Sequence, residues 1–136
     1  METIHIGENI VTLCERAKPF PTDVKGAFER LAAKVNGFEG RTMYGISYWE
    51  NDGLQYLAAC SAKSENEAKE LGTQEWTIKA GDYLSETIEN WQGNEHLFEP
   101  TFKKLGHSDN HTELPGVEWY FGNDVKCMLP IKNNKL

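Results

Sequence analysis

The chain has 136 residues, of which 39% are hydrophobic and 26% charged, and its 14 basic and 21 acidic residues give a formal net charge of −7. These values are typical of one ordinary domain that needs neither a disulfide nor a metal ion to hold its core. The acidic balance argues against direct binding of nucleic acid, which needs a basic patch, and against adhesion to an anionic membrane. A cationic partner fits the charge.

The three cysteines, Cys14, Cys60 and Cys127, are far apart, odd in number and without CxxC spacing. Each lies in an apolar or small-residue stretch, so we expect free thiols in the strands of a reduced protein. The start, METIHIGEN, has neither the basic nor the apolar region of a signal peptide, and no apolar run is long enough to span a membrane. We therefore expect a cytoplasmic protein.

The first half of the chain predicts a strand at 10–15, a helix at 24–35, and strands at 42–49 and 54–61. Pro19 and Pro21 separate the first strand from the helix, which Thr22 can cap. The turn between the last two strands contains Asp52-Gly53, a strong hairpin signal. The helix carries an apolar stripe: Val24, Ala27, Phe28, Leu31, Ala32 and Val35.

The second half repeats this order after a charged connector. It predicts strands at 76–78 and 83–88, a helix that carries Leu97, Phe98, Phe102 and Leu105, and strands at 117–121 and 125–131. Asn94 can cap that helix, although Pro100 is tolerated only in a first turn, so the regular helix begins after Asn94.

The two halves also match in sequence. Tyr48 to Asp52 corresponds to Tyr120 to Asp124 at an offset of 72, and Thr22 corresponds to Asn94 at the same offset. We therefore expect one domain, 1–136, with a duplicated architecture: unit one at about 8–61, a connector at about 62–73 and unit two at about 74–132. The predicted fold class is α+β, an antiparallel sheet with helices on one side.

Strand alternation then predicts a site. Val117, Trp119 and Phe121 share one face, which we expect to pack on the helices, while Glu118 and Tyr120 share the other. Because Ile46 corresponds to Glu118 by the offset of 72, the face with Tyr44 and Tyr48 would join them around a central cleft. The alternatives are that Glu118 is a solvated residue on an exposed face and that the aromatic stripe is ordinary core.

The second half resembles a known family. Trp76 to Tyr83 (WTIKAGDY), Pro115 to Tyr120 (PGVEWY) and Met128 to Ile131 (MLPI), with the helix between, resemble the GyrI-like effector-binding superfamily of small-molecule-binding domains. The resemblance implies two β-α-β-β units of the SHS2 type, a central ligand cleft, and Glu118 as its acidic residue. A helix-turn-helix, which the related regulators carry, has no room in the two units, so we do not expect a transcription factor.

These patterns lead to a functional hypothesis, a stand-alone binding protein, monomeric or homodimeric, for amphipathic, cationic small molecules, without a cofactor or metal ion. One alternative, implied by the resemblance, is a hydrolase of cyclopropane-bearing natural products in which Glu118 and Tyr120 are catalytic; another is a gyrase-inhibitor-like interaction module. His107, Asp109 and His111 are interpreted as a polar loop. The candidate ligand-binding residues are Glu118, Tyr120, Tyr48, Tyr44, Tyr83 and Trp91.

Overall fold

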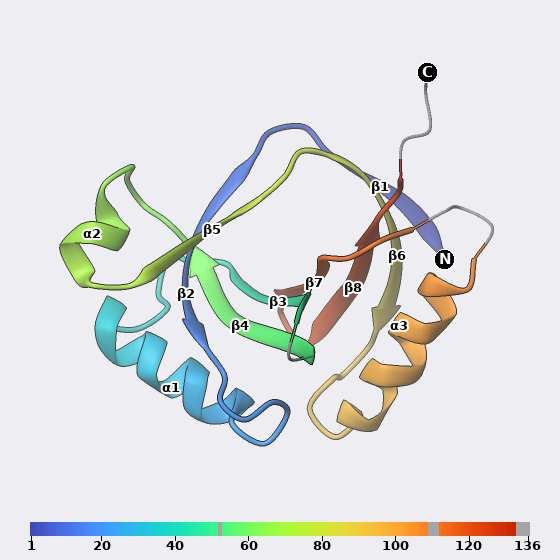
Figure 1. Cartoon of the computed structure of the whole chain (residues 1–136), viewed down its shortest axis with the longest axis horizontal. Helices are drawn as coiled ribbons and strands as arrows, with labels where there is room; N and C mark the ends of the chain where they lie inside the picture. Colours follow the sequence, from blue (N-terminus) through green and yellow to red (C-terminus); the bar gives the residue numbers. More distant parts are fainter. Residues whose placement is uncertain (52, 109–111, 133–136) are drawn as a thin grey trace.

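The eight strands of the described residues form one antiparallel sheet that curls into a half-barrel (Figure 1). The computed structural model describes residues 1–51, 53–108 and 112–132. The elements in chain order are β1 (Glu2–Ile6), β2 (Ile10–Arg16), α1 (Val24–Val35), β3 (Met43–Glu50), β4 (Gly53–Ser61), α2 (Glu67–Leu71), β5 (Gln74–Ile78), β6 (Gly81–Ile88), the 3₁₀ turn η1 (Glu95–Leu97), α3 (Phe98–Gly106), β7 (Gly116–Phe121) and β8 (Asp124–Pro130). The predicted α+β class is confirmed.

The strand order is β1-β6-β8-β7-β3-β4-β2-β5, so the two halves of the chain meet where β3 pairs with β7. The two edge strands of the sheet each pair with the other half of the chain. Strand β1, from the first half, pairs with β6 of the second half, and β5, from the second half, pairs with β2 of the first half. Sequence reasoning missed β1 altogether. No helix in the described part of the chain has the length and apolar character needed to cross a membrane.

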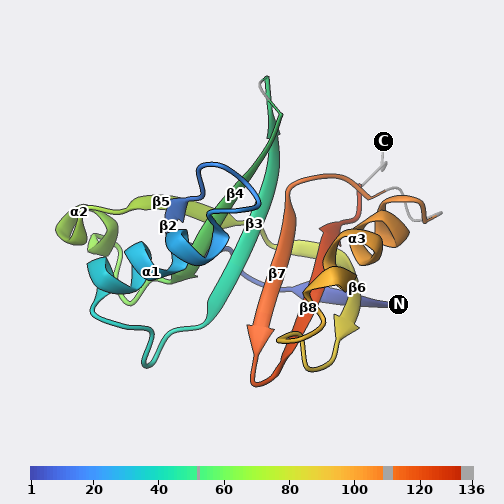
Figure 2. The ribbon, with the colours of Figure 1, turned by 90° about the horizontal axis from the view of Figure 1, so that it is seen from below.

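The outer face of the sheet carries the helices. Helix α1 buries Ala27, Leu31 and Val35, spaced four residues apart, against β2 and β4, and it ends where Asn36 adopts a left-handed conformation. Helix α3 buries Leu105 against β6 and β8, and Pro100 is its third residue, in the first turn where proline is tolerated. Figure 2 shows α1 and α3 on either side of the β3–β7 seam.

The inner face of the sheet encloses a second core, built from Tyr44, Ile46, Val117 and Met128 together with Trp119 and other apolar side chains of the strands. The prediction that Val117, Trp119 and Phe121 pack on the helices is therefore wrong: the first two lie in this inner core, and Phe121 is exposed.

The physical reason is that the curled sheet buries its inner face as well as the face that carries the helices, so an apolar strand face does not have to point to the helices. A separate one-residue error in the predicted correspondence between the halves misplaced Tyr44 and Tyr48. Ile46 pairs with Leu57 in one hairpin and Val117 pairs with Met128 in the other, and each pair spans 11 residues. The equivalent of Ile46 is thus Val117, at an offset of 71 instead of 72. Because side chains alternate along a strand, an error of one residue transfers every side chain to the opposite face.

The other local predictions fare better. The helix at 24–35 and the predicted strands are present, with ends that differ by at most two residues, and the connector contains the short helix α2. The three cysteines lie in strands, buried and free, as predicted. Asp52 of the predicted turn, and Asp109 and His111 of the predicted polar loop, lie outside the described residues.

Candidate functional site

Glu118 lies at the centre of the outer face, on β7, where the two halves of the sheet meet. Its neighbours across the strands are Gly45 on β3 and Cys127 on β8, and it is 8% exposed. A Cβ atom on Gly45 would collide with the Tyr56 hydroxyl and with a carboxylate oxygen of Glu118. The glycine therefore provides the space that these two polar groups occupy.

Two phenols hold the carboxylate. Tyr56 and Tyr120 both donate hydrogen bonds to Oε1 of Glu118, at 2.8 and 2.5 Å. Among the described residues, no cationic side chain forms an ion pair with Glu118. Burial raises the pKa of Glu118, and the two phenol hydrogen bonds oppose that rise only in part. The acid is thus buried without a countercharge.

The same environment keeps the phenols protonated. Burial and the nearby Glu118 carboxylate raise the pKa of Tyr56 and of Tyr120 above the ordinary value for tyrosine. At neutral pH both hydroxyl groups therefore carry the proton that they donate to Glu118, and neither can supply a positive charge. The cluster can balance the Glu118 charge only by taking up a proton or a cation.

Aromatic rings surround this carboxylate, and we call Phe20, Phe28, Tyr56, Trp91 and Tyr120 the aromatic box. The Phe20 ring is stacked on Tyr56, with centroids 5.4 Å apart and planes 4° from parallel. Phe28 of α1 presents its edge to Tyr56 and Tyr120, at 6.4 and 6.1 Å. Trp91, which belongs to the second half of the chain like Tyr120, packs on the Tyr120 ring with centroids 5.1 Å apart. The box therefore spans the seam between the halves.

The structure brings together three of the six predicted site residues. Glu118 and Tyr120 share a hydrogen bond, and Trp91 packs on Tyr120. The proposed role of Trp91 was based only on its position next to the second helix. Its contact with Tyr120 places it in the box.

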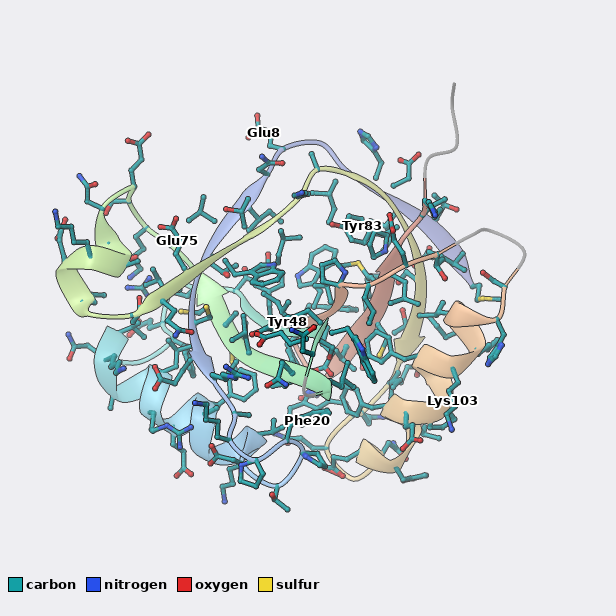
Figure 3. The ribbon with its side chains drawn as sticks, viewed as in Figure 1. Glu8, Phe20, Tyr48, Glu75, Tyr83 and Lys103 are labelled. Atoms are coloured by element: carbon teal, nitrogen blue, oxygen red, sulfur yellow. The ribbon has the colours of Figure 1, made fainter. Side chains whose placement is uncertain are left out.

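The other three predicted residues lie on the inner face, away from Glu118. Tyr44 and Tyr83 are 6% and 4% exposed, and the Tyr83 hydroxyl donates to the carbonyl of Lys79 at 2.7 Å. Tyr48 packs on Trp76 with ring centroids 4.9 Å apart. Figure 3 shows Tyr48 and Tyr83 within the curve of the sheet and Phe20 on the helix side. The shared face predicted for Tyr44, Tyr48 and Glu118 is wrong, because of the one-residue offset described above.

Sequence reasoning missed Tyr56, Phe28 and Phe20 as members of the site. Alternation in β4 puts Tyr56 on the face with Ala58 and Cys60, so the correct offset would have placed it near Glu118. Phe28 was predicted as a residue of the apolar helix stripe. It does pack against the core beneath α1, and its ring also contacts Tyr56 and Tyr120. Phe20 lies between two prolines in a loop, and nothing in the local pattern indicates its contact with Tyr56.

The hollows that we describe lie elsewhere on the molecule. One, of about 670 Å³, lies between α1, β2 and the start of β5, and a smaller one of about 320 Å³ lies near the N-terminus and β6. None of the five box residues lines either hollow. The described residues contain no group of three or more histidine, cysteine or acidic side chains placed to hold a metal ion.

No protein-family model and no curated protein matches the chain. Three solved structures share its fold over 96% of its length. An integron cassette protein from the mobile metagenome of Vibrio cholerae is 16% identical, with a TM-score of 0.69 and 95% of its own chain covered. SAV2435, bound to tetraphenylphosphonium, is 11% identical, with a TM-score of 0.72 and 93% covered. A hydrolase from Listeria innocua is 9% identical, with a TM-score of 0.59 and 90% covered. At these identities the similarity establishes a common fold, and one protein with this fold binds a lipophilic cation.

Proposed function

We propose that the protein binds amphipathic, cationic small organic molecules in the aromatic box, with Glu118 as the countercharge. The observation that carries the proposal is the carboxylate itself, which is 8% exposed. Among the described residues it accepts hydrogen bonds only from phenols and forms no ion pair with a cation. Buried acids of this kind are costly unless something balances the charge. A bound organic cation would balance it.

The chemistry of the box suits a delocalised cation better than a compact ammonium group. A delocalised cation is weakly hydrated, so moving it into an apolar site costs less free energy than moving an ammonium group. The faces of Tyr56, Tyr120 and Trp91 would add cation–π attraction of roughly 0.5–2 kcal/mol each. Such contacts discriminate weakly between ligands, so we expect broad specificity.

Entry of a ligand requires Phe20 to move. Its ring is stacked on Tyr56, in the place where an aromatic ring of a ligand would stack. Phe20 is only half-buried and lies in the loop between β2 and α1, so its displacement need not disturb a strand or a helix. We infer that Phe20 occupies the box of the free protein and that the ligand replaces it. The bound tetraphenylphosphonium of the structural neighbour SAV2435 supports the ligand class.

Titration of tryptophan fluorescence with tetraphenylphosphonium tests the proposal, with Trp91 as the reporter within the box. Glu118→Gln keeps the shape of the side chain and removes its charge, so we expect the affinity to fall at least about tenfold, which corresponds to one lost charge interaction of roughly 1.4 kcal/mol. Glu75→Gln, an exposed glutamate on β5, is the matched control and should leave the affinity unchanged. Equal affinity of the wild type and Glu118→Gln would refute the proposal.

A second, uncharged probe separates charge recognition from apolar binding. Triphenylphosphine oxide carries aromatic rings like those of tetraphenylphosphonium and no net charge. The wild type should bind it more weakly than the cation, and Glu118→Gln should bind the two with similar affinity. A wild-type preference for the neutral probe would contradict a role of the carboxylate as countercharge.

The architecture expected from the resemblance remains part of the proposal. We infer that the units at about 8–61 and 74–132 arose by duplication of an SHS2-type unit and that the site lies between them. Their hairpins support this inference, because Ile46–Leu57 and Val117–Met128 are equivalent pairs that meet at the β3–β7 seam. The site would then belong to neither unit alone.

One observation favours a second candidate function, hydrolysis. The pKa of Glu118 is raised and Tyr120 lies 2.5 Å from its carboxylate, an arrangement that suits general acid or base catalysis. In a strained-ring substrate, Glu118 would take a proton from water as the oxygen attacks a ring carbon and the bond from that carbon to its ring neighbour breaks. Glu118 would then give the same proton to the carbon that is released. Product analysis after incubation with a cyclopropane-bearing electrophile separates the candidates, because a binding protein returns the ligand unchanged.

A further inference from the structure

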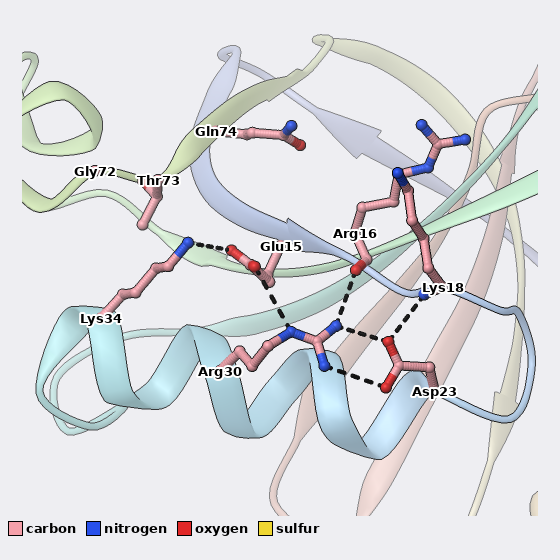
Figure 4. A pocket seen from close by; sticks show the side chains of 9 residues that line it. All are labelled: Glu15, Arg16, Lys18, Asp23, Arg30, Lys34, Gly72, Thr73 and Gln74. Carbon is pink, nitrogen blue, oxygen red and sulfur yellow. Dashed lines mark hydrogen bonds and ion pairs between the residues drawn. The ribbon is translucent and has the colours of Figure 1, made fainter.

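The groove between α1, β2 and the start of β5 is chemically unlike the aromatic box. It has a volume of about 670 Å³, within the range of small-molecule sites, and it is lined by charged and polar side chains (Figure 4). Four of its residues are basic and two are acidic, in a chain whose net charge is −7. The lining residues are Glu15, Arg16, Lys18, Asp23, Arg30, Lys34, Gly72, Thr73 and Gln74.

The two acids of the groove are already neutralised. Asp23 forms an ion pair with Arg30 at 2.7 Å, and Glu15 forms one with Lys34 at 2.9 Å. Arg30 also reaches the carbonyl of Arg16 and lies 3.7 Å from Glu15, so its guanidinium is fully engaged. Pairing each acid with one of these bases leaves two positive charges on the groove.

Those two charges belong to Arg16 and Lys18. Arg16 donates to the neutral amide of Gln55, and its carboxylate neighbour, Glu50, is 3.9 Å away. The ammonium group of Lys18 forms no hydrogen bond or ion pair with the described residues. In Figure 4 both side chains extend in the same direction along the wall of the groove. Two cationic groups on one groove, a Lys18 unpaired among the described residues and an Arg16 whose ion pair with Glu50 is long, suit a doubly charged anion.

The local sequence preserves this arrangement at a cost. Gly26 lies within α1, where glycine is about 1 kcal/mol less favourable than alanine. A Cβ atom on Gly26 would collide with a carboxylate oxygen of Asp23 and lie 3.1 Å from Arg30. The glycine therefore keeps the space in which Arg30 and Asp23 pair, and that pair prevents Asp23 from neutralising Lys18.

We propose that this groove binds a small hydrophilic dianion, a phosphate monoester or a dicarboxylate, on Arg16 and Lys18. The opposite wall, which includes the exposed amide of Gln74, is polar and uncharged, and it suits the hydroxylated part of such a molecule. The site is separate from the aromatic box, and neither its ligand nor its charge resembles those of the box.

Isothermal titration with glycerol 3-phosphate, succinate and acetate tests the proposal, in a buffer free of other oxyanions. We expect saturable binding of one equivalent of at least one dianion, and weaker binding of acetate, which has a single charge. The stronger of the two dianions identifies the head group. Absence of saturable binding of either dianion in the low millimolar range would overturn the proposal.

Two lysine variants of equal charge locate the site. Lys18→Gln should weaken binding of the dianion about tenfold, as expected for the loss of one hydrogen bond between charged groups. Lys25→Gln removes an exposed lysine of α1 that does not line the groove and should leave the affinity unchanged. Equal weakening by both variants would show attraction by overall charge and would refute a defined site. Both lysines are exposed, and an unchanged unfolding midpoint checks that each variant folds.

Discussion

Glu67 and Glu118 are two shielded carboxylates of one chain in opposite surroundings. The Glu67 side chain, on α2, is 13% exposed and meets the guanidinium of Arg41 through two hydrogen bonds, at 2.7 and 2.6 Å. The backbone amide of Lys63 donates to it as well. These partners lower the pKa of Glu67 to about 2. Among the described residues, Glu118 has only phenols as hydrogen-bond partners, and its pKa is raised.

In our proposal, this difference separates a structural acid from an acid that a ligand neutralises. The chain supplies Arg41, itself 4% exposed, to neutralise Glu67 and to tie the connector helix to the start of β3. No cation from the described part of the chain pairs with Glu118, although the residue lies in the middle of the sheet. We propose that a cationic ligand provides Glu118 with the positive charge that Arg41 provides to Glu67, and the variants below test that distinction.

The largest expected effect is on stability at Glu67. Glu67→Gln removes one partner of a buried ion pair and leaves the Arg41 guanidinium without its countercharge, so we expect a loss of about 3 kcal/mol in the free energy of unfolding at pH 7. Urea denaturation measures this loss. The matched substitution Glu118→Gln should be neutral or stabilising, because it removes a buried charge that pairs with no cation of the described residues.

The opposite ranking would contradict the comparison. If Glu118→Gln destabilised the fold more than Glu67→Gln, Glu118 would be a structural acid, and its phenol hydrogen bonds would be its main role. Tetraphenylphosphonium supplies a control in the same experiment. It should raise the unfolding midpoint of the wild type and of Glu67→Gln, and it should have little effect on Glu118→Gln.

The next effect concerns the space around the carboxylate. Gly45→Ala places a methyl group against Tyr56 and Glu118, so we expect a loss of about 2 kcal/mol in stability and a weaker affinity for tetraphenylphosphonium. Gly7→Ala is the control, because no atom lies within 4 Å of a Cβ built there. Urea denaturation and fluorescence titration measure the two effects. A Gly45→Ala protein with wild-type stability and affinity would mean that the cluster relaxes freely.

Much of the fold could be predicted because its signals are local. The apolar stripe from Val24 to Val35 and the alternating strands on either side follow from short patterns of residues. Strand β1 is different: it pairs with β6, more than seventy residues away, and its own sequence, ETIHI, is short and contains only two apolar residues. Pairing with a distant strand at the edge of a sheet leaves little trace in the local sequence.

The candidate site could be predicted only in part, because its membership depends on register. Glu118 and Tyr120 are two residues apart on one strand, so alternation alone places them together. Tyr56 comes to them from β4 across β3, and the correct register had to be known to within one residue. The repeat of the hairpin sequence indicated the wrong residue, and the assignment of Tyr44 and Tyr48 to the face of Glu118 followed from that error.

A smaller effect is the opposite pH dependence of the two acids. The raised pKa of Glu118 means that the folded protein binds the Glu118 proton more tightly than the unfolded chain does. Protonation of Glu118 therefore stabilises the fold at low pH, and this stabilisation is lost as the pH rises above about 4.5. The lowered pKa of Glu67 gives a contribution that is present above about 4.5 and lost as the pH falls towards 2. Urea denaturation of each variant between pH 3 and 8 measures both trends.

Each variant should therefore diverge from the wild type on its own side of the pH scale. Glu118→Gln should gain stability relative to the wild type as the pH rises, and the deficit of Glu67→Gln should shrink as the pH falls. Cation binding competes with the proton on Glu118, so the affinity for tetraphenylphosphonium should weaken in acid. Parallel pH profiles of the two variants would argue against different environments for the two carboxylates.

The smallest effect on stability is expected at Phe20, whose ring is stacked on Tyr56 in the aromatic box. Phe20→Ala removes one stacked, half-buried ring and should cost about 1 kcal/mol in stability. Because the ligand no longer has to displace that ring, its affinity should rise about fivefold. Phe38→Ala, which removes a ring from Phe28 outside the box, is the control and should leave the affinity unchanged. A weaker affinity of Phe20→Ala would mean that Phe20 holds the ligand as a wall of the box, and that Glu118 is reached by another route.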